Sequence, residues 1–172
     1  SRKRRPTLQI GNHVDVTWQA RLADQLGMMT VEPRRAFASE AMDDATTLAA
    51  LTSITALTRL LAEREPHPNL FVVTLFVLGF LDDPSVWPAL LVRWELALLD
   101  DLGYGLDLTK CADRGVNDDL AYVSPKSGRA VSRSSGEPYR DRMLALPPFL
   151  AGRTGTAPLQ SEIMAGFELT GY

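Results

Sequence analysis

The chain has 172 residues, of which 45% are hydrophobic and 23% are charged, and its net charge is −3. This composition excludes a disordered tail, and the length is sufficient for one full hydrophobic core with a small second module. A single cysteine, Cys111, excludes an internal disulfide, and the longest apolar run, residues 70–81, is shorter than the roughly 20 residues that span a bilayer. No secretory signal opens the chain, so we expect a cytoplasmic protein.

Charge is distributed unevenly along the chain. Residues 1–35 carry seven basic and three acidic side chains, residues 36–107 carry three and eleven, and residues 108–172 carry eight and seven. This asymmetry is typical of a protein that touches nucleic acid through one part of its surface, although ordinary solvated charge would produce it equally well.

The first part of the chain has the pattern of short strands. In residues 13–20 apolar and polar side chains alternate, and a Gly-Asn turn signal separates this segment from a second predicted strand, residues 7–10. Residues 28–32 are predicted as a third strand, with Pro33 as its boundary. Because three short strands rarely stand alone, this portion either packs on a helical body or belongs to a larger β domain.

The chain then becomes helical for about 70 residues. Residues 34–44 are the first predicted helix, and a leucine and isoleucine stripe predicts a second, capped by Thr46 or Thr47 and ending at Glu63. Residues 70–81 are apolar on nearly every face and are predicted as a third helix. Short links between these segments favour antiparallel neighbours in an all-α bundle.

The fourth predicted helix, residues 86–102, is the segment on which the rest of the chain packs. Its apolar residues recur at helical spacing with others on both flanks, so most of its surface must be buried. Ser85 is the predicted N-cap, Pro88 is tolerated in the first turn, and Gly103 supplies the left-handed residue that ends the helix.

The pattern changes again after this helix. Residues 120–131 predict a small hairpin with a loop of turn-forming residues, and residues 147–158, rich in proline and glycine, are a connection. Helical spacing returns from Leu159 onward. The predicted fold is therefore mainly α with a small β part.

Side chains suited to catalysis or metal binding are sparse. His13 and His67 have no second ligand at metal spacing, and the four Asp-Asp pairs fall at predicted helix ends or in loops, where solvated or capping roles are usual. Neither a phosphate-binding loop nor a nucleophile elbow occurs. We therefore expect a protein that is not an enzyme.

Positive charge gives a stronger signal. Two groups of basic residues, one around the strands and one in the hairpin, are candidates for contact with DNA phosphates: Arg2, Lys3, Arg4, Arg5, Arg21, Arg34 and Arg35, and Lys126, Arg129 and Arg133, followed by Arg140 and Arg142. Without a helix that reads bases, such groups favour binding that is independent of sequence and sensitive to salt. Trp18 and Tyr122 could stack on bases, but we expect both to be packed.

Several stretches, in this order, resemble the bacterial RecO family of DNA repair and recombination mediators. They are RWELALL at residues 93–99, LGYGLDL at 102–108 and LAYVSPKSG at 120–128, with VTW at 16–18 and REPHP at 64–68 agreeing upstream. The resemblance implies that residues 1–32 are the remnant of an N-terminal oligonucleotide-binding (OB) fold. Residues 33–172 would then be a C-terminal helical domain with a hairpin insertion at 109–140, and the opening strands of the barrel and the end of the last helix would lie outside this sequence.

The resemblance also implies a function. The expected protein binds single- and double-stranded DNA without sequence specificity, anneals complementary strands, and works with RecR to load the RecA recombinase. It would contact the acidic C-terminal tail of single-strand-binding protein, need no cofactor, avoid membranes and associate with the nucleoid. The competing hypothesis, a helical scaffold that binds proteins and not DNA, is favoured by the acidic central portion, residues 36–107.

Many RecO relatives carry a zinc site made of two Cys-x-x-Cys pairs, and this chain departs from that pattern. The matching positions here are Cys111, Arg114, Ser132 and Ser135. One thiolate with an arginine and two serines cannot hold tetrahedral zinc, so we predict no metal. Packing of Leu120, Tyr122 and Val131 would then hold the hairpin on the body, with Cys111 acting as a small buried hydrophobic residue.

Overall fold

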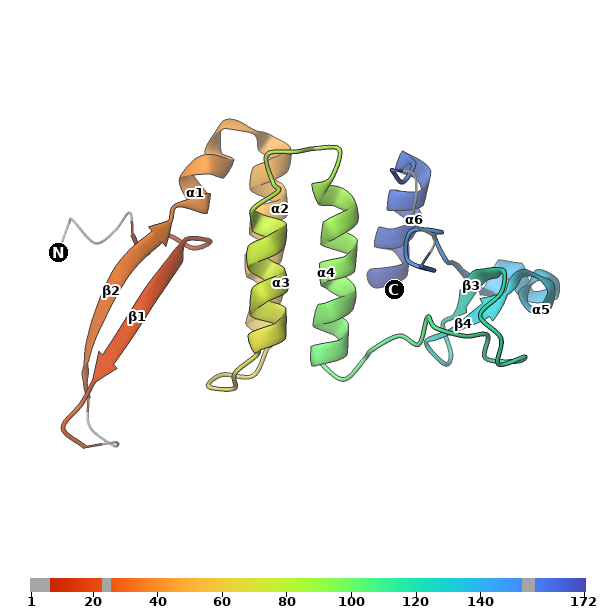
Figure 1. The fold of residues 1–172 in the computed structure, drawn as a ribbon, viewed down its shortest axis with the longest axis horizontal. Helices are drawn as coiled ribbons and strands as arrows, with labels where there is room; N and C mark the ends of the chain where they lie inside the picture. The colour runs from red at the N-terminus through yellow and green to blue at the C-terminus, as the bar shows by residue number, and fades with distance from the viewer. Residues whose placement is uncertain (1–6, 23–25, 153–156) are drawn as a thin grey trace. The chain divides into compact units, whose positions relative to one another are not determined.

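The computed structural model describes residues 7–22, 26–152 and 157–172 (Figure 1). The chain divides into two compact units, Ser1–Arg59 and Leu60–Tyr172. Within the described ranges helices predominate, with a two-stranded antiparallel sheet in the first unit and a three-stranded one in the second. The predicted mainly helical fold with a small β part is therefore confirmed, whereas the domain boundary after residue 32 stays a prediction.

The first unit begins with a ribbon of two antiparallel strands, β1 (His13–Gln19) and β2 (Met28–Arg35). The strand predicted at residues 7–10 is wrong, because this segment forms turns that lead into Gly11 with a φ of +95°. The boundary predicted at Pro33 is also wrong. Proline is tolerated inside β2 because the ribbon has two edges and its register shifts between His13 and Val14.

The helical segment after the ribbon begins at Phe37 instead of Arg34 and ends at Leu60 instead of Glu63. It consists of α1 (Phe37–Glu40), the 3₁₀ turn η2 (Ala41–Asp43), α2 (Ala45–Leu57) and the 3₁₀ turn η3 (Thr58–Leu60). The predicted caps, Thr46 and Thr47, are wrong, because the N-cap of α2 is Asp44, whose Oδ1 accepts the Thr47 N–H at 2.7 Å. Hydrogen bonds from the Thr46 hydroxyl and from Thr47 lower the pKa of Asp44 to about 2.

In the second unit, α3 (Pro68–Leu78) and α4 (Trp87–Asp101) confirm the two strongly apolar helices that the sequence predicts, with slightly different ends. Ser85 is not the N-cap of α4. Val86 holds that position, and the Ser85 hydroxyl donates to Asp83 Oδ1 at 2.6 Å. Gly103 has the expected left-handed conformation, with a φ of +86°.

Helix α4 packs between α3 and α6 (Gln160–Thr170). Trp94 is fully buried, and its indole N–H donates to the Thr74 hydroxyl of α3 at 2.8 Å. On the other side, a Cβ atom at Gly166 of α6 would lie 2.9 Å from Val92 Cγ1. Glycine therefore allows α6 to approach α4 closely.

The hairpin at residues 120–131 is confirmed and belongs to a larger arrangement. Its strands are β3 (Leu120–Ser124) and β4 (Arg129–Ser132), and the two-residue strand β5 (Leu144–Ala145) pairs with the other side of β3. The short helix α5 (Arg133–Gly136) and the 3₁₀ turn η4 (Glu137–Arg142) lie between β4 and β5 in the chain. Strand β5 and helix α5 carry no periodic signal because they are two and four residues long.

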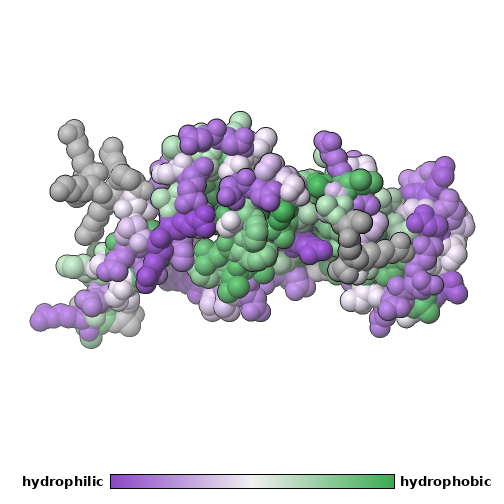
Figure 2. Space-filling view, turned by 45° about the horizontal axis from the view of Figure 1, so that its top comes forward, coloured by the Kyte–Doolittle hydropathy of each residue, from purple (hydrophilic) through white to green (hydrophobic). Residues whose placement is uncertain are grey.

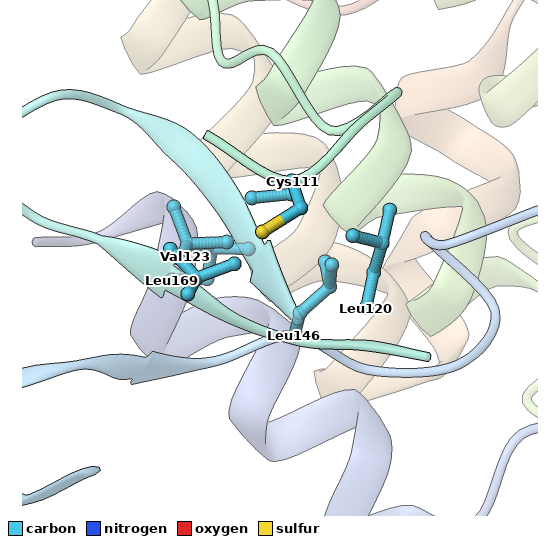
Figure 3. Packing of buried hydrophobic residues seen from close by; sticks show 7 residues of the cluster. Cys111, Leu120, Val123, Leu146 and Leu169 are labelled. Atoms are coloured by element: carbon cyan, nitrogen blue, oxygen red, sulfur yellow. The ribbon is translucent and has the colours of Figure 1, made fainter. Parts of the chain in front are cut away.

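A hydrophobic cluster holds this sheet on the helices (Figure 3). Leu120 and Val123 of β3 pack with Cys111, with Leu146 and with Leu169 of α6. Val131 is buried and Tyr122 packs at the margin, as the sequence predicts. Within the part of the chain that the structure describes, no helix has the length and hydrophobicity needed to traverse a bilayer.

Candidate nucleic-acid interface

The first group of predicted DNA-binding residues lies mostly on the β1–β2 ribbon. The ribbon cations are Arg21, Arg34 and Arg35, all exposed; Arg2, Lys3, Arg4 and Arg5 fall outside the described residues. Arg34 forms an ion pair with Asp15 of the facing strand, which lowers the pKa of Asp15. Arg35 binds both carboxylate oxygens of Glu40, with Nη2 2.8 Å from Oε2, and its guanidinium lies 4.5 Å from the centre of the Phe37 ring.

These ion pairs leave the arginines accessible to phosphate. The side chains of Arg34 and Asp15 are 60% and 44% exposed, and those of Arg35 and Glu40 are 46% and 50% exposed. Water screens exposed pairs, so a DNA phosphate can take the place of the carboxylate at little cost.

The two faces of the ribbon differ in chemistry. Val16, Trp18 and Met29 share one face, because Trp18 pairs with Met29 and Val16 lies two residues before Trp18, and each is about half exposed. The opposite face carries Asp15 and Arg34. The expectation that Trp18 is packed is therefore wrong, since 52% of it is exposed.

The second group lies on the β3–β4 hairpin of the second unit. The hairpin cations are Lys126, Arg129 and Arg133. Arg129 Nε lies 3.5 Å from Asp107 Oδ2, and Arg133 Nε lies 3.5 Å from Asp119 Oδ2. Lys126 is exposed in the loop between the strands, and none of the described acidic side chains forms an ion pair with it. Figure 2 shows hydrophilic side chains gathered around the hairpin and α5.

Beyond these groups, Arg140 of η4 pairs with Glu137 and Asp141 at 3.7 and 3.5 Å, and Arg142 is exposed. Arg34 and Arg35 are neighbours at the end of β2, and Lys126 and Arg129 lie in the hairpin loop and at the start of β4. The two groups belong to different units.

Of the four positions that match a zinc site, Cys111 and Ser132 contact each other, whereas Arg114 bonds Ser134 and Ser135 bonds Asp113. Cys111 Sγ accepts the Ser132 N–H at 3.3 Å and lies 3.5 Å from Ser132 Oγ, and the Ser135 hydroxyl donates to Asp113 at 2.8 Å. A thiol, two hydroxyls and the guanidinium of Arg114 do not fit zinc, because a cationic group cannot serve as a ligand. In the described ranges, no three His, Cys, Asp or Glu side chains converge on a metal position.

Cys111 is fully buried in the hydrophobic cluster, and its sulfur also contacts polar groups. Burial raises the pKa of its thiol, but hydrogen bonds from the hydroxyl and N–H of Ser132 and from the N–H groups of Arg114 and Asp113 outweigh it and lower the pKa to about 7. The prediction that Cys111 is a small buried residue of the core is confirmed, and the structure adds its hydrogen bonds with Ser132.

An apolar hollow of about 410 Å³ opens beside the hairpin. Its walls come from the end of α4, the segment after it, the β3–β4 loop, β5 and the end of α6, and include Leu99, Tyr104, Leu106, Val123, Leu144, Thr170 and Tyr172. Tyr104 and Tyr172 are 74% and 81% exposed. The hydroxyl of the wall residue Thr170 donates to Glu95 at 2.5 Å, and burial raises the pKa of Glu95. Sequence reasoning missed this hollow because its walls come from five separate segments.

Neither histidine forms part of a catalytic arrangement in the described residues. His67 Nδ1 lies 2.8 Å from Asp101 Oδ2, which joins the start of α3 to the end of α4. His13 begins β1 at the register shift. Both positions are structural in character.

Comparison with known proteins gives a consistent result. The family model described as "Recombination protein O C terminal" matches residues 42–165. A protein of Methylobacterium nodulans called "DNA repair protein RecO" is 52% identical over 176 residues, which cover 100% of this chain and 72% of that protein. Proteins of the same name from Methylorubrum extorquens and Rhizobium etli are each 51% identical, with 100% of this chain and 72% and 67% of those proteins covered.

Proposed function

The chain belongs to the RecO family of DNA repair proteins, and from that premise we propose that it binds DNA without sequence specificity and mediates strand annealing and recombinase loading. Family membership itself establishes a role in DNA repair and recombination, in a family of mediators that are not known as enzymes. The observation that supports the finer proposal is the exposure of the ribbon cations and hairpin cations, which lie on strands, in turns or, for Arg133, at the start of α5.

The chemistry of these cations favours contact with the backbone of DNA over reading of bases. Arginine and lysine on short strands neutralise phosphates, which allows two complementary strands to come together without being distinguished by sequence. The apolar face of the ribbon, with Val16, Trp18 and Met29, supports the proposal that the ribbon is part of an OB barrel, whose other strands would cover that face.

Binding of single-stranded and duplex oligonucleotides at about 50 and 200 mM salt tests this proposal. Replacing Arg34 and Arg35 with glutamine, or Lys126 and Arg129 with glutamine, removes two phosphate contacts. We expect each double variant to bind more weakly and to lower the salt slope for single strands by about 1.4.

The matched control replaces Arg59 and Arg64 with glutamine; both arginines are exposed and lie outside the ribbon cations and the hairpin cations. We expect the affinity and salt slope of this variant to equal those of the unmodified protein. Equal losses in all three double variants would show that net charge, and no particular surface, determines binding.

For protein partners, we propose RecR and the acidic C-terminal tail of single-strand-binding protein. The apolar hollow supports a site for the tail, because its walls can take an aromatic side chain while Lys126, between the wall residues Pro125 and Ser127, can pair with carboxylates. An acidic peptide ending in phenylalanine should bind Tyr104→Ala and Lys126→Gln more weakly, whereas Tyr139→Ala, at a second exposed tyrosine, should bind normally.

The second candidate function is a helical scaffold that binds proteins alone. The exposed apolar side chains Val72, Phe76 and Phe80 on and after α3 favour it, as does the acidic composition of residues 36–107. Absence of oligonucleotide binding at low salt would favour the scaffold. For the DNA-binding mediator, we propose a location in the cytoplasm at the nucleoid.

A further inference from the structure

Two loops meet at the base of the β3–β4 hairpin. Residues 111–116 form a tight turn in which the Gly115 N–H donates to the Cys111 carbonyl at 2.8 Å and the Cys111 N–H donates to the Val116 carbonyl at 2.7 Å. The second loop, residues 132–135, begins at the last residue of β4 and continues as the first turn of α5. Side chains of the two loops contact each other: the Ser135 hydroxyl donates to Asp113, and the Arg114 guanidinium donates to the Ser134 hydroxyl.

The separation of one pair of positions in this contact, Cys111 and Ser132, is compatible with two ligands of a four-coordinate site. Zinc–sulfur bonds of about 2.3 Å place two ligand sulfurs of a tetrahedral site about 3.8 Å apart. Cys111 Sγ lies 3.5 Å from Ser132 Oγ, close to that separation. The other two positions of the site, Arg114 and Ser135, follow Cys111 and Ser132 by three residues, the spacing of paired ligands in structural zinc sites.

In this chain, hydrogen bonds join the two loops where a metal ion would bridge them in a zinc site. Cys111 and Ser132 are 0% and 2% exposed, so water does not compete for the two contacts between them. The outer contacts, from Ser135 to Asp113 at 2.8 Å and from Arg114 to Ser134 at 3.3 Å, hold the remaining parts of the loops together.

We infer that these two loops form a metal-independent clamp, in which hydrogen bonds take the place of a bound ion and the backbone keeps positions 111 and 132 at the separation of two zinc ligands. The loop clamp, defined by Cys111, Asp113, Arg114, Ser132, Ser134 and Ser135, fixes the base of the hairpin. Its function is structural: the N–H of Arg133, next to Ser132, donates to the Asp119 carbonyl at 2.9 Å, which sets the start of β3 against the end of β4.

The first test uses the unmodified full chain. We expect purified, tag-free protein to contain far less than one zinc per chain by elemental analysis, and its melting temperature to stay the same in EDTA. One zinc per chain, or a lower melting temperature in EDTA, would overturn the inference.

The second test restores the thiolates. The variant R114C/S132C/S135C should bind one zinc or cobalt per chain, with the visible absorption that cobalt shows in a tetrahedral thiolate site. The control S127C/R142C/S161C adds three thiols at exposed positions on three other segments and should bind no stoichiometric metal. A folded R114C/S132C/S135C variant without bound metal, or one that stays unfolded with zinc present, contradicts the retained geometry.

The third test addresses the hydrogen bonds directly. Ser132→Ala removes a buried hydroxyl from Cys111 and should lower the melting temperature by about 5 °C. Ser127→Ala, in the exposed hairpin loop, should change it by less than about 1 °C. Equal melting temperatures for S132A and the unmodified protein would show that the Cys111–Ser132 contact does not hold the loops.

Discussion

The two small sheets of this protein have similar strands and different surroundings. No residue of β1 or β2 is buried, whereas five of the nine residues of β3 and β4 are. The difference follows from what each sheet packs against within its own unit, because the second sheet shares a hydrophobic cluster with Leu146 and with Leu169 of α6. A strand pattern in sequence therefore predicts local conformation, while burial depends on a partner surface that comes from elsewhere in the chain.

The largest expected difference between the two sheets comes from placing a charged side chain in each of them. Val123 is 1% exposed and Val16 is 51% exposed. We expect Val123→Asp to lower the free energy of unfolding by about 4 kcal/mol, because its carboxylate would lie unpaired among apolar side chains. Val16→Asp should cost less than about 1 kcal/mol.

Urea unfolding followed by tryptophan fluorescence measures both effects, since Trp18 reports on the first unit and Trp87 and Trp94 report on the second. Similar losses for the two variants would mean that the ribbon is buried in solution.

The close approach of α6 to α4 at Gly166 is one reason why the second unit is well packed. A Cβ atom at Gly166 would meet Val92, which is fully buried and cannot move aside. Gly166→Ala should therefore lower the free energy of unfolding by about 2 kcal/mol through overpacking. As a control, Gly79→Ala at the end of α3 keeps an ordinary helical φ of −68° and should change stability by less than about 1 kcal/mol.

A smaller effect is expected from the capping carboxylate in the first unit. Hydrogen bonds lower the pKa of Asp44 to about 2 from the usual 3.8, so its stabilisation of α2 is complete above pH 3.8 and is lost as the pH falls toward 2. Asp44→Ala should lower the melting temperature at pH 7 by less than Gly166→Ala does. The difference between Asp44→Ala and the unmodified protein should shrink on acidification, and a difference that grows toward pH 2 would contradict this assignment.

The smallest effect concerns the exposed ion pair of the ribbon. Asp15→Asn removes the partner of Arg34 and one negative charge from the polar face. We expect little change in stability and about twofold tighter binding of single-stranded DNA at low salt. Weaker binding would show that Asp15 positions Arg34 for DNA.

The sequence predicts most accurately the segments whose signals are local. Helix α4 and the β3–β4 hairpin follow from apolar spacing and turn residues, and Gly103 ends α4 as expected. The resemblance to the RecO family is confirmed over the full chain. These features depend on neighbouring residues, which a single sequence displays directly.

Other features depend on contacts that the sequence does not display. Pro33 lies inside β2 because the ribbon has free edges there, and Asp44 caps α2 although two threonines stand close by. The apolar hollow needs five segments to meet, and the partners of Arg129 and Arg133, Asp107 and Asp119, both lie in the segment between α4 and β3. The positions of candidate cations could be predicted, but not their carboxylate neighbours.

The contact between Cys111 and Ser132 has a consequence for life under oxidative stress. A zinc site of four thiolates releases its metal when oxidants attack sulfur, and the segment around it then loses its shape. In this protein a single sulfur, fully shielded from solvent, takes part, and the serines beside it are not oxidised under the same conditions. With the loop clamp as proposed, the hairpin would keep its shape in the oxidising conditions that damage DNA, and its folding would draw on no zinc.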